Sequence, residues 1–143
     1  MFLLELNWLA ILVAFVVAFA AGALWFGPKT FFPVWWKAMG RSNDEQPGGN
    51  MAVVFGLTAL GALVQVVAVA SVIYFVSLAA GPVGPLGGMI TGLLLGVGFA
   101  AASSLSHRLF AGQGLKVWII EASSDVVNYT LVGLVIGLFG LIG

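Results

Sequence analysis

Four long apolar runs constrain this 143-residue chain more than any other feature of its sequence. They lie near residues 6–26, 51–79, 88–107 and 117–141. A helix needs about 20 mostly apolar residues to cross the roughly 30 Å hydrocarbon core of a bilayer. Only 7% of the residues are charged, whereas a soluble domain carries about 25%. We therefore expect an all-α polytopic membrane protein in which residues 1–143 form one domain of four transmembrane helices.

Two of the connections between these runs are short and contain turn-forming residues. Residues 80–87 include Pro82 and Pro85, and residues 108–116 include Gly112 and Gly114. Proline and glycine are typical of tight turns, and short connections join antiparallel helices. The sequence therefore predicts an antiparallel four-helix bundle.

The basic residues indicate the orientation of the bundle. Lys29, Lys37 and Arg41 lie between the first and second runs, and Arg108 and Lys116 lie between the third and fourth. Short loops rich in Lys and Arg stay on the cytoplasmic side of a membrane. This pattern predicts a multi-pass protein of the cell inner membrane with both termini on the outer, periplasmic side.

The segment after the first run interleaves aromatic residues with lysines. Trp rings and Lys side chains settle at the level of the lipid headgroups. We expect interfacial anchors at Trp25, Lys29, Trp35, Trp36 and Lys37. Pro33 suits the first position of a helix and Gly40 its C-terminal cap, so a short interfacial helix is expected near residues 33–40. The alternative is a platform that docks lipid headgroups or a partner protein.

Two of the runs carry a small residue at every fourth position. The first run has Ala10, Ala14, Ala18 and Gly22, and the third has Gly88, Gly92, Gly96 and Ala100. Small residues let helices approach closely in lipid, where no hydrophobic force draws the helices together. The two rows are equally consistent with packing inside the bundle and with packing in a homo-oligomer.

The fourth run contains polar side chains that need partners. Glu121, Asp125 and Asn128 share one helical face because they follow one another at spacings of four and three. A charged side chain at mid-membrane costs at least about 2.5–3.5 kcal/mol. His107 and Arg108 end the third run, just across a short connection. We expect an Arg108–Glu121 ion pair first, and a contact of His107 with either acid second.

Serine hydroxyls add further donors near these carboxylates, at Ser103, Ser104 and Ser124. One interpretation is a polar clasp that holds the last two helices in register. The other is a proton or cation relay through Asp125, Glu121 and His107.

Gln65 lies in the middle of the second run, where its amide also needs a partner. The simpler expectation is one interhelical hydrogen bond, which contributes about 0.6 kcal/mol on average. The alternative is a polar site at mid-membrane that faces Asn128 or Thr91.

The sequence lacks the residues that common catalytic sites require. It has one histidine and no cysteine, and it has no HExxH, CxxC or GxSxG spacing. We therefore predict no catalytic residues, no metal site and no cofactor. The formal net charge is zero and no long basic run occurs, which argues against a nucleic-acid partner.

The order of several short motifs resembles a known family. Asn7-Trp8-Leu9-Ala10 opens the first run, and Gly22-Ala23-Leu24-Trp25-Phe26 followed by Pro28 closes it. The aromatic segment ends in Met39-Gly40, and Lys116 precedes an apolar stretch and Glu121. In these motifs the chain resembles domain-of-unknown-function family 1761, a family of small bacterial membrane proteins. The resemblance implies a four-helix membrane architecture and no assigned activity. The chain has Phe26 and Gly27 where many members have Tyr and Ser.

These features together favour a protein that acts by association. We expect membrane lipid around it, and either a homo-oligomer or a small accessory subunit of a membrane complex. The alternative is a small proton- or cation-linked transporter or channel that uses the intramembrane acids.

Overall fold

The computed structural model describes residues 1–142, with side chains described to residue 140. This part of the chain is helical and contains no β-strand, which confirms the all-α prediction. The elements in order are η1 (Phe2–Glu5), α1 (Trp8–Trp25), α2 (Phe32–Ala38), α3 (Met51–Ala80), α4 (Pro85–Leu95), the π-helical turn η2 (Gly96–Ala101), α5 (Ala102–Phe110) and α6 (Gly114–Ile142).

Four stretches are long and apolar enough to cross a membrane. They are Trp8–Trp25, Met51–Ala80, Pro85–Phe110 and Gly114–Gly140, and the third combines α4, η2 and α5. The protein is thus an all-α polytopic membrane protein. The first span begins slightly later than residue 6 because Leu6 is extended and the Asn7 side chain caps α1 by accepting a hydrogen bond from the Ala10 N–H at 3.1 Å.

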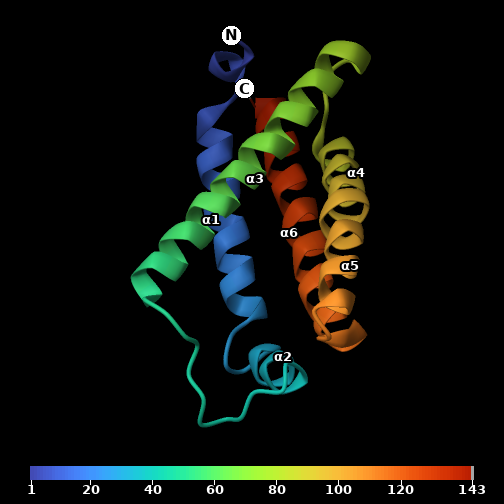
Figure 1. Cartoon of the computed structure of the whole chain (residues 1–143). Coiled ribbons are helices and arrows are strands. Elements are labelled where there is room, and N and C mark those ends of the chain that lie inside the picture. The colour runs from blue at the N-terminus through green and yellow to red at the C-terminus, as the bar shows by residue number, and fades with distance from the viewer. Residues whose placement is uncertain (143) are drawn as a thin grey trace.

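Successive spans run in opposite directions. Both termini lie at one end of the bundle, and α2 and the α5–α6 turn lie at the other end (Figure 1). Glycines with positive φ allow the chain to turn at Gly81, Gly112 and Gly114. The basic residues Lys29, Lys37 and Arg41 flank or belong to α2, so they lie at the end opposite the termini.

The glycine row of the third span packs against α6 inside the same chain. A Cβ at Gly88 would overlap the backbone carbonyl of Gly133, and a Cβ at Gly92 would overlap that of Tyr129. A Cβ at Gly96 would lie 3.1 Å from the Cα of Val126. Ala100 is only half-buried. This row therefore serves packing within the chain, a point that the sequence left open.

The small row of α1 also packs inside the bundle. Ala10, Ala14 and Ala18 are buried at 0%, 0% and 7% exposure. The buried cluster around them includes Val66 and Val69 of α3 and further side chains of α6. Gly22, at the end of the row, is partly exposed, and a Cβ there would lie 3.7 Å from the Asn128 Nδ2.

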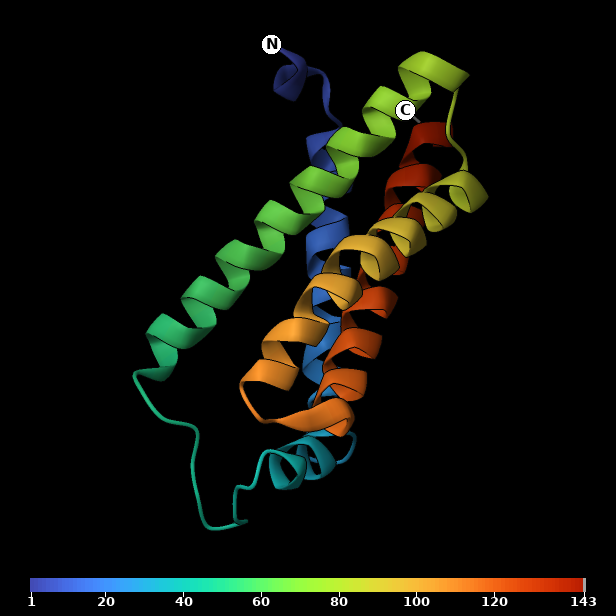
Figure 2. The ribbon, with the colours of Figure 1, turned by 45° about the vertical axis from the view of Figure 1, so that its right-hand side comes forward.

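Helix α3 packs on the bundle only through its second half. Its buried residues are Val66, Val69, Ala70 and Ile73. Residues 51–58 are all exposed, and the first half of α3 diverges from the other helices in both views (Figures 1 and 2). One side of the bundle is therefore left uncovered at the end that carries α2.

The third span is interrupted where the sequence predicted a continuous helix. The turn η2 is π-helical. The Ala101 carbonyl accepts hydrogen bonds from the Trp118 Nε1 at 2.9 Å and the Ser104 Oγ at 3.1 Å. A π turn weakens the regular i→i+4 pattern, and the Trp118 indole of α6 compensates for this loss.

Candidate functional site

The polar residues of α6 meet α5 and α2 at the end of the bundle opposite the termini. The Arg108 Nε donates to the Glu121 Oε2 at 2.6 Å, and the Trp35 Nε1 donates to the Glu121 Oε1 at 2.9 Å. Arg108 also donates through Nη1 to the Gln113 side chain. We call Trp35, Arg108, Gln113 and Glu121 the Glu121 clasp. Both carboxylate oxygens have a donor, so the clasp joins α2, α5 and α6.

The Arg108–Glu121 ion pair is the contact that the sequence placed first. The Glu121 side chain is 15% exposed and that of Arg108 is 35% exposed. Charged hydrogen bonds of this geometry are stronger than neutral ones. Trp35, which the sequence assigned only to interfacial anchoring, is the second partner of Glu121. The sequence carries no signal for this contact because the two residues are 86 positions apart.

The other tryptophans near this end also make specific contacts. The Trp25 Nε1 donates to the Ile120 carbonyl at 3.0 Å, which ties the end of α1 to α6. Trp36 is buried at 8% exposure, and its Nε1 donates to the Ser42 carbonyl at 2.9 Å. These two indoles are therefore engaged with the protein backbone, beyond the interfacial anchoring that the sequence predicted.

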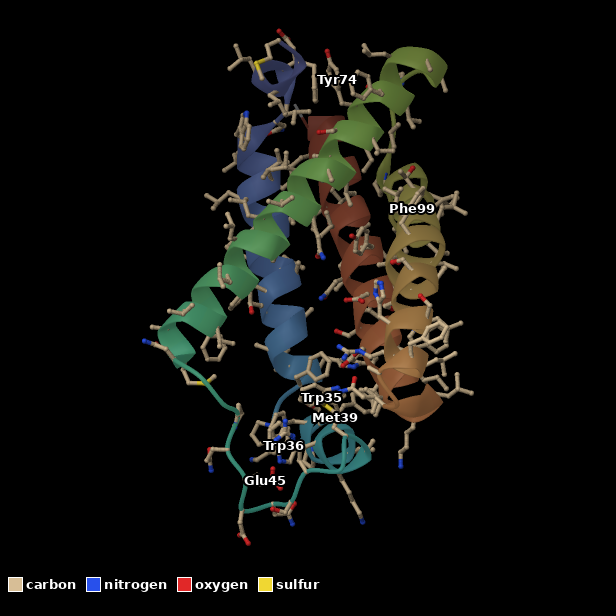
Figure 3. All side chains as sticks on the ribbon, in the orientation of Figure 1. Trp35, Trp36, Met39, Glu45, Tyr74 and Phe99 are labelled. Carbon is tan, nitrogen blue, oxygen red and sulfur yellow. The ribbon has the colours of Figure 1, made fainter. Side chains whose placement is uncertain are left out.

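The loop after α2 is held by Arg41. Its guanidinium carbon lies 5.5 Å from the centroid of the Trp36 ring, and its Nη1 lies 3.3 Å from the Glu45 Oε2. Figure 3 shows Trp35 and Trp36 on α2 and Glu45 in this loop. The Ser42 backbone N–H and the Arg41 side chain lower the pKa of Glu45. Lys29 and Lys37 are exposed at this end, as anchors would be.

Four of the residues expected near the carboxylates are not in the clasp. His107 is exposed, and within the described residues its imidazole side chain makes no hydrogen bond or ion pair. The Ser104 hydroxyl donates to the Ala101 carbonyl, and the Ser103 hydroxyl donates to the Ala100 carbonyl. Serines in a helix commonly bond to the preceding turn, which removes these donors from the carboxylates. Ser124 is buried at 4% exposure on α6.

Asp125 and Asn128 lie further along α6 than the clasp. In the described part of the chain, neither side chain has a hydrogen bond from another residue. Asn128 and Gln65 line a cavity of about 40 Å³ between α1, α3 and α6. Gln65 is therefore beside Asn128, whereas Thr91 donates its hydroxyl to the Gly87 carbonyl.

This arrangement has two chemical consequences. The clasp is a satisfied polar network, which fixes the positions of three helices. The groups beyond it, Asp125, Asn128 and Gln65, have hydrogen-bonding capacity left over in an apolar surrounding. Among the described residues, no three His, Cys, Asp or Glu side chains are grouped so that they could hold a metal ion.

Comparisons with known proteins give one match. The model of a family described as "Protein of unknown function (DUF1761)" matches residues 9–137. No curated protein and no solved structure matches the chain. The match includes most of each of the four spans, and its description assigns no activity.

Proposed function

This chain belongs to the DUF1761 family of proteins of unknown function, and we propose that it acts by association with other transmembrane helices. The association is either with further copies of itself or with a membrane complex of which it is a small subunit. The support comes from the uncovered side of α3.

One face of α3 is both exposed and suited to helix packing. It follows the alternating spacing of four and three residues that a parallel helix pair requires. We call this face the α3 seam, and it consists of Val54, Thr58, Gly61, Gln65, Ala68 and Val72. All six residues are exposed, and a Cβ at Gly61 would meet nothing within 4 Å.

The composition of the α3 seam differs from that of the neighbouring lipid-facing surface. Large side chains flank the seam, including Leu57, Leu60 and Val64, which are 64%, 57% and 60% exposed. The middle of the seam has instead two polar residues, Thr58 and Gln65, and two small residues, Gly61 and Ala68. Small and polar residues are enriched where transmembrane helices contact each other. A lipid-facing surface gains nothing from an exposed amide, because hydrocarbon offers it no hydrogen bond.

The small-residue rows of the first and third spans do not support association between chains. Both are used inside the bundle, where Gly92 meets α6 and Ala14 is fully buried. The α3 seam takes their place as the support for association. A second copy is the simplest partner, since copies inserted with the same orientation present parallel seams. Gln65 lines the small cavity beside Asn128 and is also exposed, and its amide is both donor and acceptor, so it can pair with the same amide of a second copy across a two-fold axis.

The mass of the protein, extracted gently in native lipid, tests this proposal. We expect a homo-oligomer or a complex with another membrane protein, because the α3 seam would then be covered. A monomer without any co-purifying protein, over the range of concentrations found in the membrane, would contradict the proposal.

Single cysteines locate the contact, since the chain has none of its own. Gly61→Cys places a thiol on the α3 seam, and Leu60→Cys places one about 100° around α3 from it, at a flanking position where the native side chain is 57% exposed. We expect oxidation in native membranes to convert Gly61→Cys to a species of twice the monomer mass and to leave Leu60→Cys monomeric. The reverse result would place the contact on another face, and cross-linking to a different protein would indicate an accessory subunit.

The proposal includes a location in the cell inner membrane with both termini outside. It is supported by the placement of Lys29, Lys37 and Arg41 at the end opposite the termini. A membrane-impermeant thiol reagent applied from outside intact cells should fail to label Ser42→Cys, and labelling there would contradict this orientation.

A second candidate function is proton or cation conduction, favoured by Asp125. This acid lies one turn from Glu121 and makes no hydrogen bond with another described residue. Intramembrane acids commonly mark ion pathways. If this function holds, Asp125→Asn should abolish ion flux into reconstituted vesicles, while Asp44→Asn in the exposed loop should leave the flux unchanged. Flux that is insensitive to Asp125→Asn would exclude this role for the acid.

A further inference from the structure

A cavity at the end of the bundle that holds both termini takes no part in the functions proposed above. Its volume is about 340 Å³, and its walls come from the η1–α1 junction, the second half of α3, the α3–α4 turn and α6. Sites for small molecules typically measure about 300–1,000 Å³. The cavity is therefore large enough for a small organic ligand.

The inner wall of the cavity is apolar. It includes Leu6, Ala70 and Ile73, which are 7%, 5% and 5% exposed. These residues belong to the buried cluster between α1, α3 and α6. A ligand with an alkyl group would remove further apolar surface from water here, worth about 25 cal/mol per Å².

The rim of the cavity is polar. It includes Glu5, Asn7 and Tyr74. The Asn7 Oδ1 is occupied by the Ala10 N–H, which leaves the amide NH₂ group available. Within the described residues, the Glu5 carboxylate has neither an ion pair nor a hydrogen bond.

Aromatic packing holds the rim in place. The Phe2 ring, on the same turn as Glu5, stacks on Tyr74 with ring centroids 6.4 Å apart and contacts Phe75 at 5.0 Å. Figure 3 shows Tyr74 near the N-terminal end of the chain. This packing keeps η1, and Glu5 with it, beside the second half of α3.

The side chains that line the cavity carry one formal negative charge. Glu5 is the one ionisable acid or base among the lining side chains apart from the Tyr74 phenol, and no Lys, Arg or His lines the cavity. A carboxylate beside an aromatic ring and an apolar wall suits a cation that carries an alkyl group.

We propose that this cavity binds an alkylammonium group, with its cation beside Glu5 and Tyr74 and its alkyl part against Leu6, Ala70 and Ile73. The group can come from a free amphiphilic amine or from the amine headgroup of a membrane lipid. The chemistry at the protein is the same in both cases.

Calorimetric titration of the purified chain with n-hexylammonium chloride tests the site. In maltoside micelles, which contain no amine, we expect saturable binding that Glu5→Gln weakens by about three- to tenfold, as for a partly solvated ion pair. Asp44→Asn, which removes an exposed acid at the opposite end, should leave the affinity unchanged. Since Glu5 is exposed, the variant should fold, and its circular dichroism should match that of the parent chain.

The same titration in nanodiscs distinguishes the sources of the amine. Phosphatidylethanolamine should compete with n-hexylammonium if the lipid headgroup is the ligand, whereas phosphatidylglycerol discs should retain the binding seen in micelles. Retained binding in both kinds of disc would assign the site to a free amine. The proposal is overturned if n-hexanol binds as tightly as n-hexylammonium, if Glu5→Gln leaves the affinity unchanged, or if no saturable binding occurs in micelles.

Discussion

Gly92→Ala should destabilise the bundle by about 1–3 kcal/mol, which is the usual cost of adding a methyl group to a well-packed core. The new Cβ would overlap the backbone carbonyl of Tyr129, and a backbone group cannot rotate away as a flexible side chain can. Helices α4 and α6 would have to separate, which weakens the contacts of Gly88 and Gly96 as well. The loss should appear as a lower midpoint of unfolding when the protein in mild detergent is titrated with SDS.

Gly56→Ala is the matched control for this substitution. Gly56 lies in the exposed half of α3, and a Cβ there would meet nothing within 4 Å. Alanine is a better helix former than glycine by about 0.8–1.0 kcal/mol, so this variant should be neutral or slightly more stable. If both variants shift the midpoint equally, the close approach of α4 to α6 is not what stabilises the fold.

Arg108→Ala should destabilise the protein by about 2–3 kcal/mol, somewhat less than the 3–5 kcal/mol of a fully buried pair. The expected loss of stability is smaller because 35% of the Arg108 side chain is exposed and water screens part of the interaction. The substitution leaves the Glu121 carboxylate, whose side chain is 15% exposed, with Trp35 as its remaining partner in the clasp. Unfolding of the purified protein at neutral pH measures the effect.

A double variant separates the ion pair from the rest of the clasp. Arg108→Ala combined with Glu121→Gln has no unpaired charge, and the Gln side-chain oxygen can still accept from the Trp35 Nε1. The double variant should therefore be more stable than Arg108→Ala alone. Arg41→Ala breaks the exposed pair with Glu45 and should cost about 1 kcal/mol or less. A double variant less stable than Arg108→Ala would show that the ion pair does not dominate the clasp.

The architecture could be predicted from the sequence because a bilayer restricts the alternatives. Backbone groups in hydrocarbon must bond within their own helix, so each long apolar run specifies a span by length alone. The Pro- and Gly-containing connections specify the turns, and Pro33 and Gly40 indicate a helix that the structure has at Phe32–Ala38. The Arg108–Glu121 pair could also be anticipated, since a 13-residue separation across one short turn leaves few other partners.

The candidate sites depended on contacts between distant segments. Local spacing placed Glu121, Asp125 and Asn128 on one face, but it did not indicate that Trp35 would reach Glu121 from α2. It also placed His107 near the acids, whereas His107 is exposed. The rotation of each helix about its own axis decides such contacts, and that rotation is set by all of its neighbours together.

The sequence by itself determined that the helices are surrounded by lipid, and it determined the four spans and their antiparallel order. These properties depend on the apolar length of each segment and on the turns between segments. Only the tertiary structure decided that the rows at Gly92 and Ala14 are used inside the chain and that the α3 seam is left exposed. In lipid every face of a helix can be apolar, so hydrophobicity does not indicate which face is covered. The covered face is decided by close contact between particular helix backbones.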